Sequence, residues 1–516
     1  MTVHTITPDF MTCDQLWTIA RERPQLDLSS EVRSRITEGS KLVDELLASG
    51  QHIYGVNSGF GALCEERIPD DQIEQLQVNH VLSHSCGVGD IVPEDICRLM
   101  LLVKLLTFRS GRTGVSLHVV EKLIAMWNAS MIPAVPAKGT VGASGDLAPL
   151  AHAALPLLGR GLIYLSGELT SVPDLVSSGQ FSTCRLGPKD GLALTNGVQY
   201  ITATGLRALH DARELLSTAD TIAALSLQAF SCAETFFDAR YHSTTYHSER
   251  RLVASNLRHL TEGSNHHELP HCNVSKQDPY SFRCLPQVHG AVRQAVEFAT
   301  RLVEQEANGV SDNPLFFAED REVLLGGNLH GASVGLALDC AAIAMTDLAS
   351  ISERRGYQLL SGQRGLPSFL VARPGLNSGF MVVQYTAAAL LNEMKVLATP
   401  ASVDTIPTCQ LQEDHVSMGG TAAHKLLKII ENCEYVLGIE LLLAAQACQM
   451  NDELKLSPHG DELLRTVRAD VDFLDQDRVL ADDIDACAAV VARHRTRWDK
   501  ELSTLAEPRA DRDVHV

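Results

Sequence analysis

The stretch QVHGAVRQAVEFATRLVEQEANG, residues 287–309, carries the clearest structural signal in this chain. Its apolar side chains recur so that they lie on one face of a helix with 3.6 residues per turn. They are Val288, Ala291, Val292, Ala295, Ala299, Leu302 and Val303. The pair Asn308-Gly309 then supplies a stop signal. The stretch therefore predicts a long amphipathic helix that ends near residue 308.

Similar patterns recur along the rest of the chain, and several exceed the usual helix length of roughly 11–12 residues. They run through about residues 197–223, 331–355, 381–398, 420–450 and 460–500. Strand signals are few and short: GLIYLSGEL (161–169) predicts a hairpin around Ser166-Gly167, and REVLL (321–325) predicts a small ribbon. The sequence therefore predicts a mainly α fold, with a bundle of long helices after about residue 200.

The expected domain division follows from these patterns. Residues 1–200 hold shorter helices and most of the Gly-rich loops, and we expect them to form an N-terminal domain. Residues 201–505 form the long-helix domain, in which 224–285 is polar, His-rich and loop-like. The tail, 506–516, has the composition of a disordered segment.

Composition excludes some classes of partner. The 516 residues include 43 Lys and Arg against 63 Asp and Glu, a formal charge of −20. Nucleic acids and anionic membranes both need a basic footprint, so neither is expected as a partner. No run reaches the roughly 18 apolar residues of a membrane-spanning helix. A small zwitterionic substrate, held by one or two local cations, remains compatible with this charge.

Cysteine usage and the N-terminus both predict a cytoplasmic protein. The thirteen cysteines are an odd number, without a CxxC pair, which is typical of reduced thiols. The first residues, MTVHTITPDFMTCDQ, lack the basic and apolar regions of a signal peptide.

Three motifs resemble known sites but fail on their chemistry. HELPH (267–271) matches the zinc-protease pattern, yet Pro270 would break the helix that must carry both histidines, so we expect a solvated loop and no metal. GASGD (142–146) has Asp146 where a nucleophile elbow needs Gly. GGNLHG (326–331) lacks the Lys of a phosphate-binding loop.

Four other segments combine Gly or Asn with polar side chains next to long apolar helices. They are IYGVNSGFGAL (53–63), GTVGASGDLAPLAH (139–152), QDPYSFRCLPQVHG (277–290) and QEDHVSM (412–418). Each has a plain structural explanation when taken alone. Tyr54 suits a half-buried aromatic residue, Arg283 a surface ion pair, and Glu413 a helix-start acid. Irregular backbone with such side chains is nevertheless typical of functional loops.

Taken together, these segments resemble the aromatic amino acid ammonia-lyases that carry a methylidene-imidazolone group. GASGDLAPLAH and YGVNSGFG are highly specific, while QDPYSFRC and QEDHVSM resemble the histidine branch of that family. The resemblance runs through about residues 50–450. Further matching stretches are SHSCGVG (83–89), GLALTNG (191–197), SDNPLFF (311–317), ISERRGYQLLSGQRGLP (351–367) and GLNSGF (375–380). It implies a long-helix bundle of the fumarase/aspartase-like type, with a smaller N-terminal domain that carries the cofactor-forming loop.

The resemblance implies a prosthetic group made from the backbone itself. The Gly145 nitrogen would attack the Ala143 carbonyl carbon, and loss of water would leave Ser144 as an exocyclic methylene of a 5-methylidene-imidazol-4-one (MIO) ring. The residue types suit this chemistry, because Gly145 lacks a Cβ that would obstruct the attack. No metal or external cofactor is implied.

The resemblance also assigns roles to side chains. The substrate amine would add to the electrophile, which turns its nitrogen into a better leaving group. Tyr54 would then remove the β-proton of the substrate. With histidine as the substrate, the products would be trans-urocanate and ammonia, and the reaction would be the first step of histidine degradation. Asn196 would hold developing charge. Arg283 would bind the substrate carboxylate with its planar fork, beside Tyr280 and Gln277. The imidazole end would meet Glu413 and His84, with Leu329 in the substrate pocket.

Some positions depart from the family pattern. Leu329 stands where Phe is usual, and Gln410 and Leu411 replace a more polar, Asn-containing turn. Cys86 lies beside His84. These departures concern the substrate pocket, so two alternatives stay open: an ammonia-lyase or 2,3-aminomutase for another aromatic amino acid, and a non-catalytic scaffold.

The family resemblance further implies a homotetramer, in which loops of several subunits build each active site. The long apolar helices are compatible with such an assembly. The partners expected are therefore a small amino acid substrate and further copies of this chain.

Overall fold

The computed structural model describes residues 2–273 and 277–504, and the expected tail at 506–516 lies outside the described residues. The described residues form eighteen α-helices and nine short strands. By proximity of their Cα atoms they fall into two compact units. Unit 1 comprises residues 1–210, 299–339 and 400–424, and unit 2 comprises 211–298, 340–399 and 425–516. The sequence-based division at residue 200 stays a prediction.

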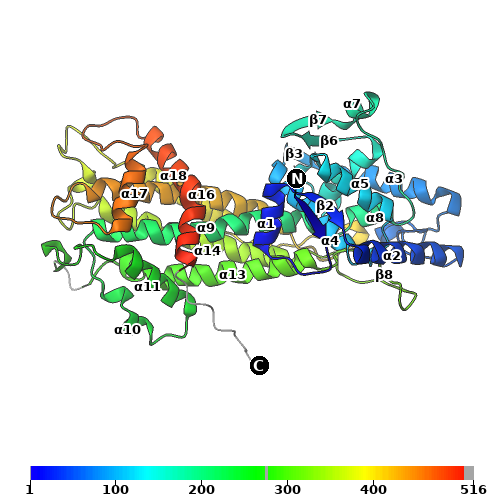
Figure 1. Ribbon diagram of the computed structural model, residues 1–516, viewed down its shortest axis with the longest axis horizontal. Coiled ribbons are helices and arrows are strands. Elements are labelled where there is room, and N and C mark those ends of the chain that lie inside the picture. The colour runs from blue at the N-terminus through cyan, green and yellow to red at the C-terminus, as the bar shows by residue number, and fades with distance from the viewer. Residues whose placement is uncertain (1, 274–276, 505–516) are drawn as a thin grey trace. The chain divides into compact units, whose positions relative to one another are not determined.

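The long helices are the dominant elements, and they can be followed by their labels in Figure 1. The predicted helix at 287–309 is α13, Leu285–Asn308, and it ends at the expected stop signal. The other long helices are α9 (Gln199–Ala229), α14 (Ala332–Leu359), α16 (Gly419–Cys448) and α18 (Ala481–Ser503). The helix α15 occupies Val383–Leu397, close to its predicted range. The mainly α fold is thus confirmed.

Two sequence-based expectations about unit 2 were wrong. The pattern at 460–500 is two helices, α17 (Pro458–Arg468) and α18, rather than one. The segment between them is held by tertiary hydrogen bonds, because Gln446 of α16 pairs with both the N–H and the carbonyl of Leu474. The stretch 224–285 is less loop-like than expected, since it holds α10 (Ala239–His242), the fourteen-residue helix α11 (Ser248–Thr261) and α12 (Tyr280–Arg283).

Buried polar contacts join the long helices within unit 2. Glu440 of α16 accepts hydrogen bonds from Ser226 of α9, at 2.7 Å, and from Ser352 of α14, at 2.6 Å. The Arg355 guanidinium binds both oxygens of the same carboxylate, and the two side chains are 0% and 1% exposed. Because a buried charge is costly without partners, this network restricts how the three helices pack.

The short strands lie in unit 1. The parallel pair is β1 (Val3–Ile6) with β2 (Gln25–Leu28), and the antiparallel pairs are β3 (Val88–Ile91) with β5 (Pro136–Lys138) and β8 (Leu315–Phe317) with β9 (Glu322–Leu324). A three-stranded sheet has the order β4 (Met131–Pro133), β6 (Leu162–Leu165), β7 (Glu168–Ser171). The hairpin around Ser166-Gly167 and the ribbon at 321–325 are therefore both confirmed.

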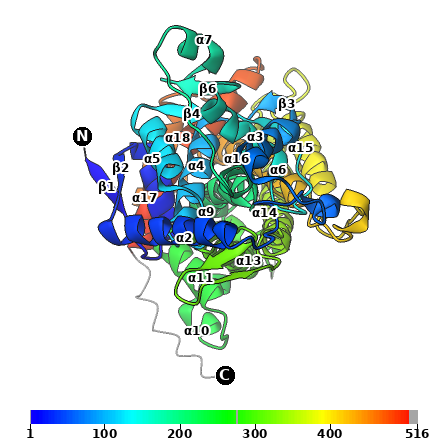
Figure 2. The same ribbon diagram turned by 90° about the vertical axis from the view of Figure 1, so that its right-hand side faces the viewer.

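Unit 1 also holds shorter helices, several of which are labelled in Figure 2. They are α1 (Cys13–Glu22), α2 (Ser30–Ala48), α3 (Ile73–His84), α4 (Glu94–Phe108), α5 (Leu117–Asn128), α6 (Leu147–Ala154), α7 (Val172–Ser177) and α8 (Asp190–Thr195). Side-chain caps fix where some of them begin: Thr12 forms a capping box with Gln15 at α1, and Ser29 accepts from the Val32 N–H at α2. Helices α3, α6 and α8 pack against one another. The end of α8 contacts α3 through His80 and Thr195, and the Gly145–Gly197 bridge brings it to the start of α6. Three of the predicted site segments lie at these helix ends.

The helix α14 is the one described helix that is long and apolar enough to cross a membrane. In the structure, 67% of its most apolar window is buried inside the protein. Such burial is what the core helix of a folded domain requires, because its apolar side chains contact other helices.

Candidate active site

The Ala143-Ser144-Gly145 triplet occupies a tight loop that ends at the start of α6. Gly145 has a φ of +75°, and a Cβ at this position would lie 2.1 Å from the Gly197 carbonyl oxygen. The next N–H, that of Asp146, donates to the same carbonyl at 2.7 Å. Only glycine fits such a contact with a left-handed backbone. The tertiary packing therefore requires the glycine that cyclisation also requires.

Two hydroxyl groups hold this loop in place. Thr140 Oγ1 donates toward the Gly145 carbonyl and the Asp146 carboxylate, at 3.2 and 3.0 Å, and accepts from the Gly142 N–H at 3.0 Å. Ser417 Oγ donates to the Gly142 carbonyl at 3.1 Å. Ser417 lies two residues before α16 begins, so this hydrogen bond connects the loop to the start of that helix.

Asp146 is fully buried beneath the loop. Its carboxylate accepts from the Ile201 N–H at 2.9 Å, in the first turn of α9, where the helix dipole favours a negative charge. Burial nevertheless raises the pKa of Asp146 to about 7. Asp146 belongs to the sequence motif, but the motif alone indicates no role for it.

The side chains of Ser144 and Glu413 are in direct contact. Ser144 Oγ donates to Glu413 Oε1 at 2.5 Å, although the two residues lie 269 positions apart. The other carboxylate oxygen accepts from Thr408 Oγ1 at 2.6 Å, and the backbones of Thr408 and Glu413 form a small antiparallel bridge. Glu413 is therefore held in place, half-buried, next to the predicted reactive serine.

Tyr54 lies in the neighbouring loop, half-buried, and its hydroxyl accepts from the Gly61 N–H at 2.9 Å. The segments Gly61–Leu63 and Cys409–Leu411 contact each other, which brings the Tyr54 loop to the Glu413 loop. Burial raises the pKa of Tyr54, and the Gly61 N–H opposes that rise because it stabilises the phenolate. The pKa of Tyr54 is therefore shifted in the direction that disfavours the ionised base.

His84 ends α3 and is half-buried. Its Nδ1 lies 2.8 Å from the His80 carbonyl oxygen, and its ring centroid lies 4.0 Å from that of His80. Burial lowers the pKa of His84, although the nearby Glu413 carboxylate favours the charged form. His80 in turn contacts Thr195 Oγ1 through Nε2, at 2.8 Å, so this pair of histidines borders the end of α8.

Asn196 follows directly after α8 and is only 3% exposed. Its side-chain oxygen Oδ1 is buried and has no hydrogen-bond partner among the described residues. The Asn196 carbonyl accepts from Lys104 Nζ of α4 at 2.6 Å. Burial lowers the pKa of Lys104 to about 7. A buried amide oxygen without a hydrogen bond costs free energy, so Asn196 Oδ1 is suited to accept a hydrogen bond from a bound group.

The positions that depart from the family pattern lie around this site. Leu329 is half-buried in the loop that leads into α14. Gln410 and Leu411 have φ values of 53° and 71°, in the left-handed region that Asn tolerates better than Leu does. Gln410 and Leu411 therefore occupy left-handed backbone positions, which suit the Asn-containing turn that is usual in the family. Cys86 is exposed, two residues beyond the end of α3.

The remaining predicted residues belong to unit 2. Tyr280 is 70% exposed in α12, and the Arg283 guanidinium carbon lies 4.6 Å from the centre of its ring. Arg283 is half-buried, and its Nε has no hydrogen-bond partner among the described residues. Gln277 is exposed directly after the undescribed residues 274–276.

The structure therefore brings together the predicted residues of unit 1: Tyr54, His84, Ala143, Ser144, Gly145, Asn196 and Glu413. It places Tyr280, Arg283 and Gln277 in unit 2. Sequence reasoning missed Thr140, Thr408, Lys104 and His80. Lys104 had a readable signal, because it interrupts the apolar run LLVKLLTF, whereas the two threonines carried none.

The rejected motifs have the structures that their chemistry suggested. The residues of HELPH form a turn and then the 3-10 segment Pro270–Asn273, so no α-helix carries His267 and His271. Ser144 contacts a carboxylate, where a serine hydrolase would have a histidine base.

The comparisons with known proteins identify the family of this chain. Residues 11–469 match the aromatic amino acid lyase family. A histidine ammonia-lyase of Symbiobacterium thermophilum is 44% identical over 482 residues, which is 93% of this chain and 95% of that protein.

Two solved structures share the fold. The crystal structure of histidine ammonia-lyase from Trypanosoma cruzi is similar with a TM-score of 0.89 and 35% identity, covering 97% of this chain and 96% of that one. Tyrosine aminomutase from Streptomyces globisporus is similar with a TM-score of 0.90 and 31% identity, covering 97% and 99%. The resemblance inferred from the four loop segments is thereby confirmed, and the chain belongs to the aromatic amino acid lyase family.

Proposed function

We propose that this protein is a histidine ammonia-lyase, which removes ammonia from L-histidine to give trans-urocanate without oxidation. One observation carries the proposal: the Glu413 carboxylate is hydrogen-bonded to Ser144. This contact joins the triplet of the electrophile to the acid that suits an imidazole ring. The identity of 44% to a histidine ammonia-lyase supports the same substrate.

The residues present fit the MIO group. Gly145 has the left-handed backbone and the Cβ-free contact that cyclisation needs, and Ala143 adds a small side chain. The orphaned Asn196 Oδ1 provides a buried acceptor for a donor of the substrate or the ring system. When formed, the group supplies an electrophilic carbon to which the substrate amine is attracted. Tyr54, Asn196, Glu413 and the loop around Thr140 would surround it.

Glu413 and His84 would recognise the imidazole end of the substrate. A carboxylate accepts a hydrogen bond from the imidazole N–H. A phenyl ring has no such donor, so its binding would remove water from the Glu413 carboxylate without providing a new partner. Thr408 already binds one oxygen of Glu413, so the oxygen that faces Ser144 is the one available to the substrate side.

Tyr54 would remove the β-proton of the substrate at its hydroxyl oxygen. The Gly61 N–H donates to this oxygen and so stabilises the phenolate that acts as the base. Since burial raises the pKa of Tyr54, proton removal should become faster as the pH rises above neutrality.

Arg283, Tyr280 and Gln277 would complete the substrate pocket. We propose a homotetramer in which these residues of unit 2 reach an active site of another subunit. The unpaired Arg283 Nε supports this role, because a guanidinium that retains donors can bind a carboxylate. Leu329 would border the same pocket.

The proposal is tested with the purified full-length protein. It is incubated separately with L-histidine, L-tyrosine and L-phenylalanine, while the absorbance of the conjugated acrylate product is followed. Histidine should give the strongest increase, together with one equivalent of ammonia. A response to tyrosine alone would overturn the histidine assignment and leave the family membership intact.

The likeness to tyrosine aminomutase, at 31% identity, supports a second candidate: a 2,3-aminomutase that returns ammonia to the β-carbon. Chromatography of the same reactions separates the two candidates, because an aminomutase accumulates a β-amino acid. The free state of all thirteen cysteines fits action in the cytoplasm, at the first step of histidine degradation.

A further inference from the structure

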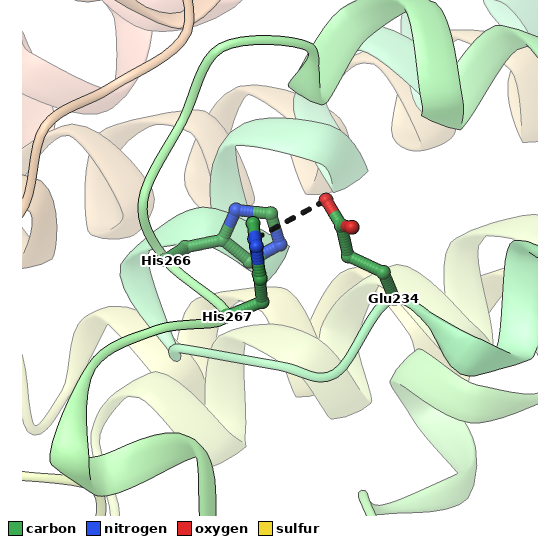
Figure 3. A group of neighbouring side chains, drawn as sticks. All are labelled: Glu234, His266 and His267. Atoms are coloured by element: carbon green, nitrogen blue, oxygen red, sulfur yellow. Dashed lines mark ion pairs between the residues drawn. The ribbon is translucent and has the colours of Figure 1, made fainter.

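Two loops of unit 2 bring Glu234, His266 and His267 together, as Figure 3 shows. Glu234 follows α9, just before the short turn Thr235–Phe237. The two histidines lie in the connection that follows α11. One nitrogen of the His266 ring points toward the Glu234 carboxylate (Figure 3).

The spacing of these side chains suits one metal ion. One ligand atom from each of the three residues lies within 4.8 Å of the other two. His267 Nδ1 lies 3.4 Å from Glu234 Oε1. Two ligands of a tetrahedral zinc ion, with bonds of about 2.0–2.1 Å, lie about 3.4 Å apart. The His267–Glu234 pair therefore already has the separation of two zinc ligands.

The hydrogen bonds of His266 leave one ring nitrogen ready to bind a cation. Ser264 Oγ donates its proton to the Lys455 carbonyl at 3.0 Å. The same oxygen lies 3.0 Å from His266 Nδ1, so it accepts from an Nδ1–H group. Nε2 then carries the lone pair. A metal-binding histidine is oriented in this way, through its second ring nitrogen.

That lone pair has no partner within the described residues. His266 is 0% exposed, and its Nε2 is buried without a hydrogen bond. His267 Nδ1 is also buried without a hydrogen bond, and the charged group that it faces is Glu234 Oε1, at 3.4 Å. The other ring nitrogen, His267 Nε2, lies 3.8 Å from Glu268 Oε1. The unpaired His266 Nε2, next to the His267–Glu234 pair, suits a cation bound by all three side chains.

A surface cavity next to the cluster leaves room for further ligands. Its volume is about 600 Å³, and Glu234, Ser264 and His267 belong to its wall. Water from this cavity can complete the coordination of an ion with three protein ligands.

The geometry points to a divalent transition-metal site formed by Glu234, His266 and His267, with zinc as the ion that its ligands suit best. This inference is independent of the proposed lyase activity. Two imidazoles and one carboxylate form a ligand set that is common for zinc. It differs from the rejected HELPH pattern, because His271 takes no part.

The ion would have a structural role, because it links two loops that support the segment before α12. Ala233, next to Glu234, donates its N–H to Asp278 Oδ2 at 3.0 Å. Arg364 binds Asp278 at 2.8 Å and also donates to the His271 carbonyl at 3.1 Å. Asp278 lies between Gln277 and the helix that carries Tyr280 and Arg283.

The test measures metal binding directly. The full-length protein is freed of metal with a chelator and titrated with Zn²⁺ in competition with a chromophoric chelator. Wild type should bind one ion per chain more tightly than E234Q or H267Q, by about tenfold or more. Both altered side chains are partly exposed, so these variants should fold. Co²⁺ should give wild type, but neither variant, the visible absorption of a low-symmetry site.

Matched variants define specificity. H247Q changes an exposed histidine outside the cluster. H459Q alters a second group, in which His459 Nδ1 lies 3.0 Å from Glu501 Oε1. Both should bind Zn²⁺ like wild type. Equal binding by wild type, E234Q and H267Q would overturn the proposal, and so would loss of binding in H459Q alone. Zn²⁺ should also raise the Tm of wild type and leave that of E234Q unchanged.

Discussion

Ser144 Oγ donates a hydrogen bond to Glu413 Oε1 at 2.5 Å, across 269 residues of sequence. The contact places the carboxylate at the side chain from which the electrophile would be built. Ser144, the precursor of the electrophile, thus contacts Glu413, the acid proposed to select the substrate.

Replacing Glu413 by Gln should lower kcat/KM for histidine by roughly 10- to 100-fold, since a hydrogen bond to a charged group is lost. Discrimination between histidine and phenylalanine should fall with it. Steady-state kinetics on both substrates measures this change. E65Q, at an exposed acid of the same unit, should behave as wild type. Unchanged discrimination in E413Q would contradict the proposed recognition of imidazole.

Replacing Ser144 by Ala should abolish turnover, because no hydroxyl remains to be eliminated. The fold should persist, because the change leaves the packing of Gly145 on Gly197 intact. Activity and circular dichroism, measured on the same preparation, test this. S34A, at an exposed serine of α2 that donates to the Glu38 carboxylate, serves as the control. Activity that survives in S144A would refute the backbone-derived electrophile.

Replacing Gly145 by Ala should destabilise the protein even when cyclisation is absent. In the S144A background, the added Cβ would lie 2.1 Å from the Gly197 carbonyl, at a φ of +75°. Gly50 is a matched control, since it has a φ of +81° and open space around it. G50A should cost about 1 kcal/mol, the backbone strain alone, and G145A should cost clearly more. Urea unfolding measures both; equal costs would show that the contact with Gly197 is unimportant.

The rate of the reaction should rise with pH above neutrality. Burial raises the pKa of Tyr54, so its phenolate is a small fraction at neutral pH and increases about tenfold for each pH unit below that pKa. The profile of kcat/KM should show this rise, and Y54F should lose the activity while it remains folded. Y241F, at an exposed tyrosine, should keep the wild-type profile. An active Y54F would assign the base to another group.

Replacing Glu440 by Gln should destabilise unit 2. The change leaves the buried Arg355 guanidinium without its charged partner, which costs about 3–5 kcal/mol. E121Q breaks an exposed pair with Arg33 and should cost less than about 1 kcal/mol. The midpoints of urea unfolding compare the two variants. A cost for E440Q as small as that for E121Q would mean that the network does not stabilise the long helices.

Most of the helical fold could be predicted from local periodicity. The pattern at 287–309 gave α13 almost to the residue, because the spacing of its apolar side chains encodes a helix directly. The break between α17 and α18 could not be predicted. Leu474 continues the apolar pattern, but its backbone is bonded to Gln446, which lies 28 residues away.

The candidate site likewise contains residues that the sequence predicts and residues that only the tertiary contacts identify. The Ala-Ser-Gly triplet, Tyr54, Asn196 and Glu413 were readable as motifs, since each has a particular residue type in a Gly-rich or polar loop. Lys104 was missed because a single lysine in an apolar helix looks like an irregularity until its contact with the Asn196 carbonyl is seen.

The sequence alone determined the long helices and the chemical identity of the reactive triplet, because both depend on neighbouring residues. Only the tertiary structure decided that Ser144 contacts Glu413, that Gly145 packs on Gly197, and that Asn196 Oδ1 is left without a partner. The physical reason is that these contacts depend on how helices and loops pack. Packing joins residues that are far apart in the chain, and local periodicity holds no record of it.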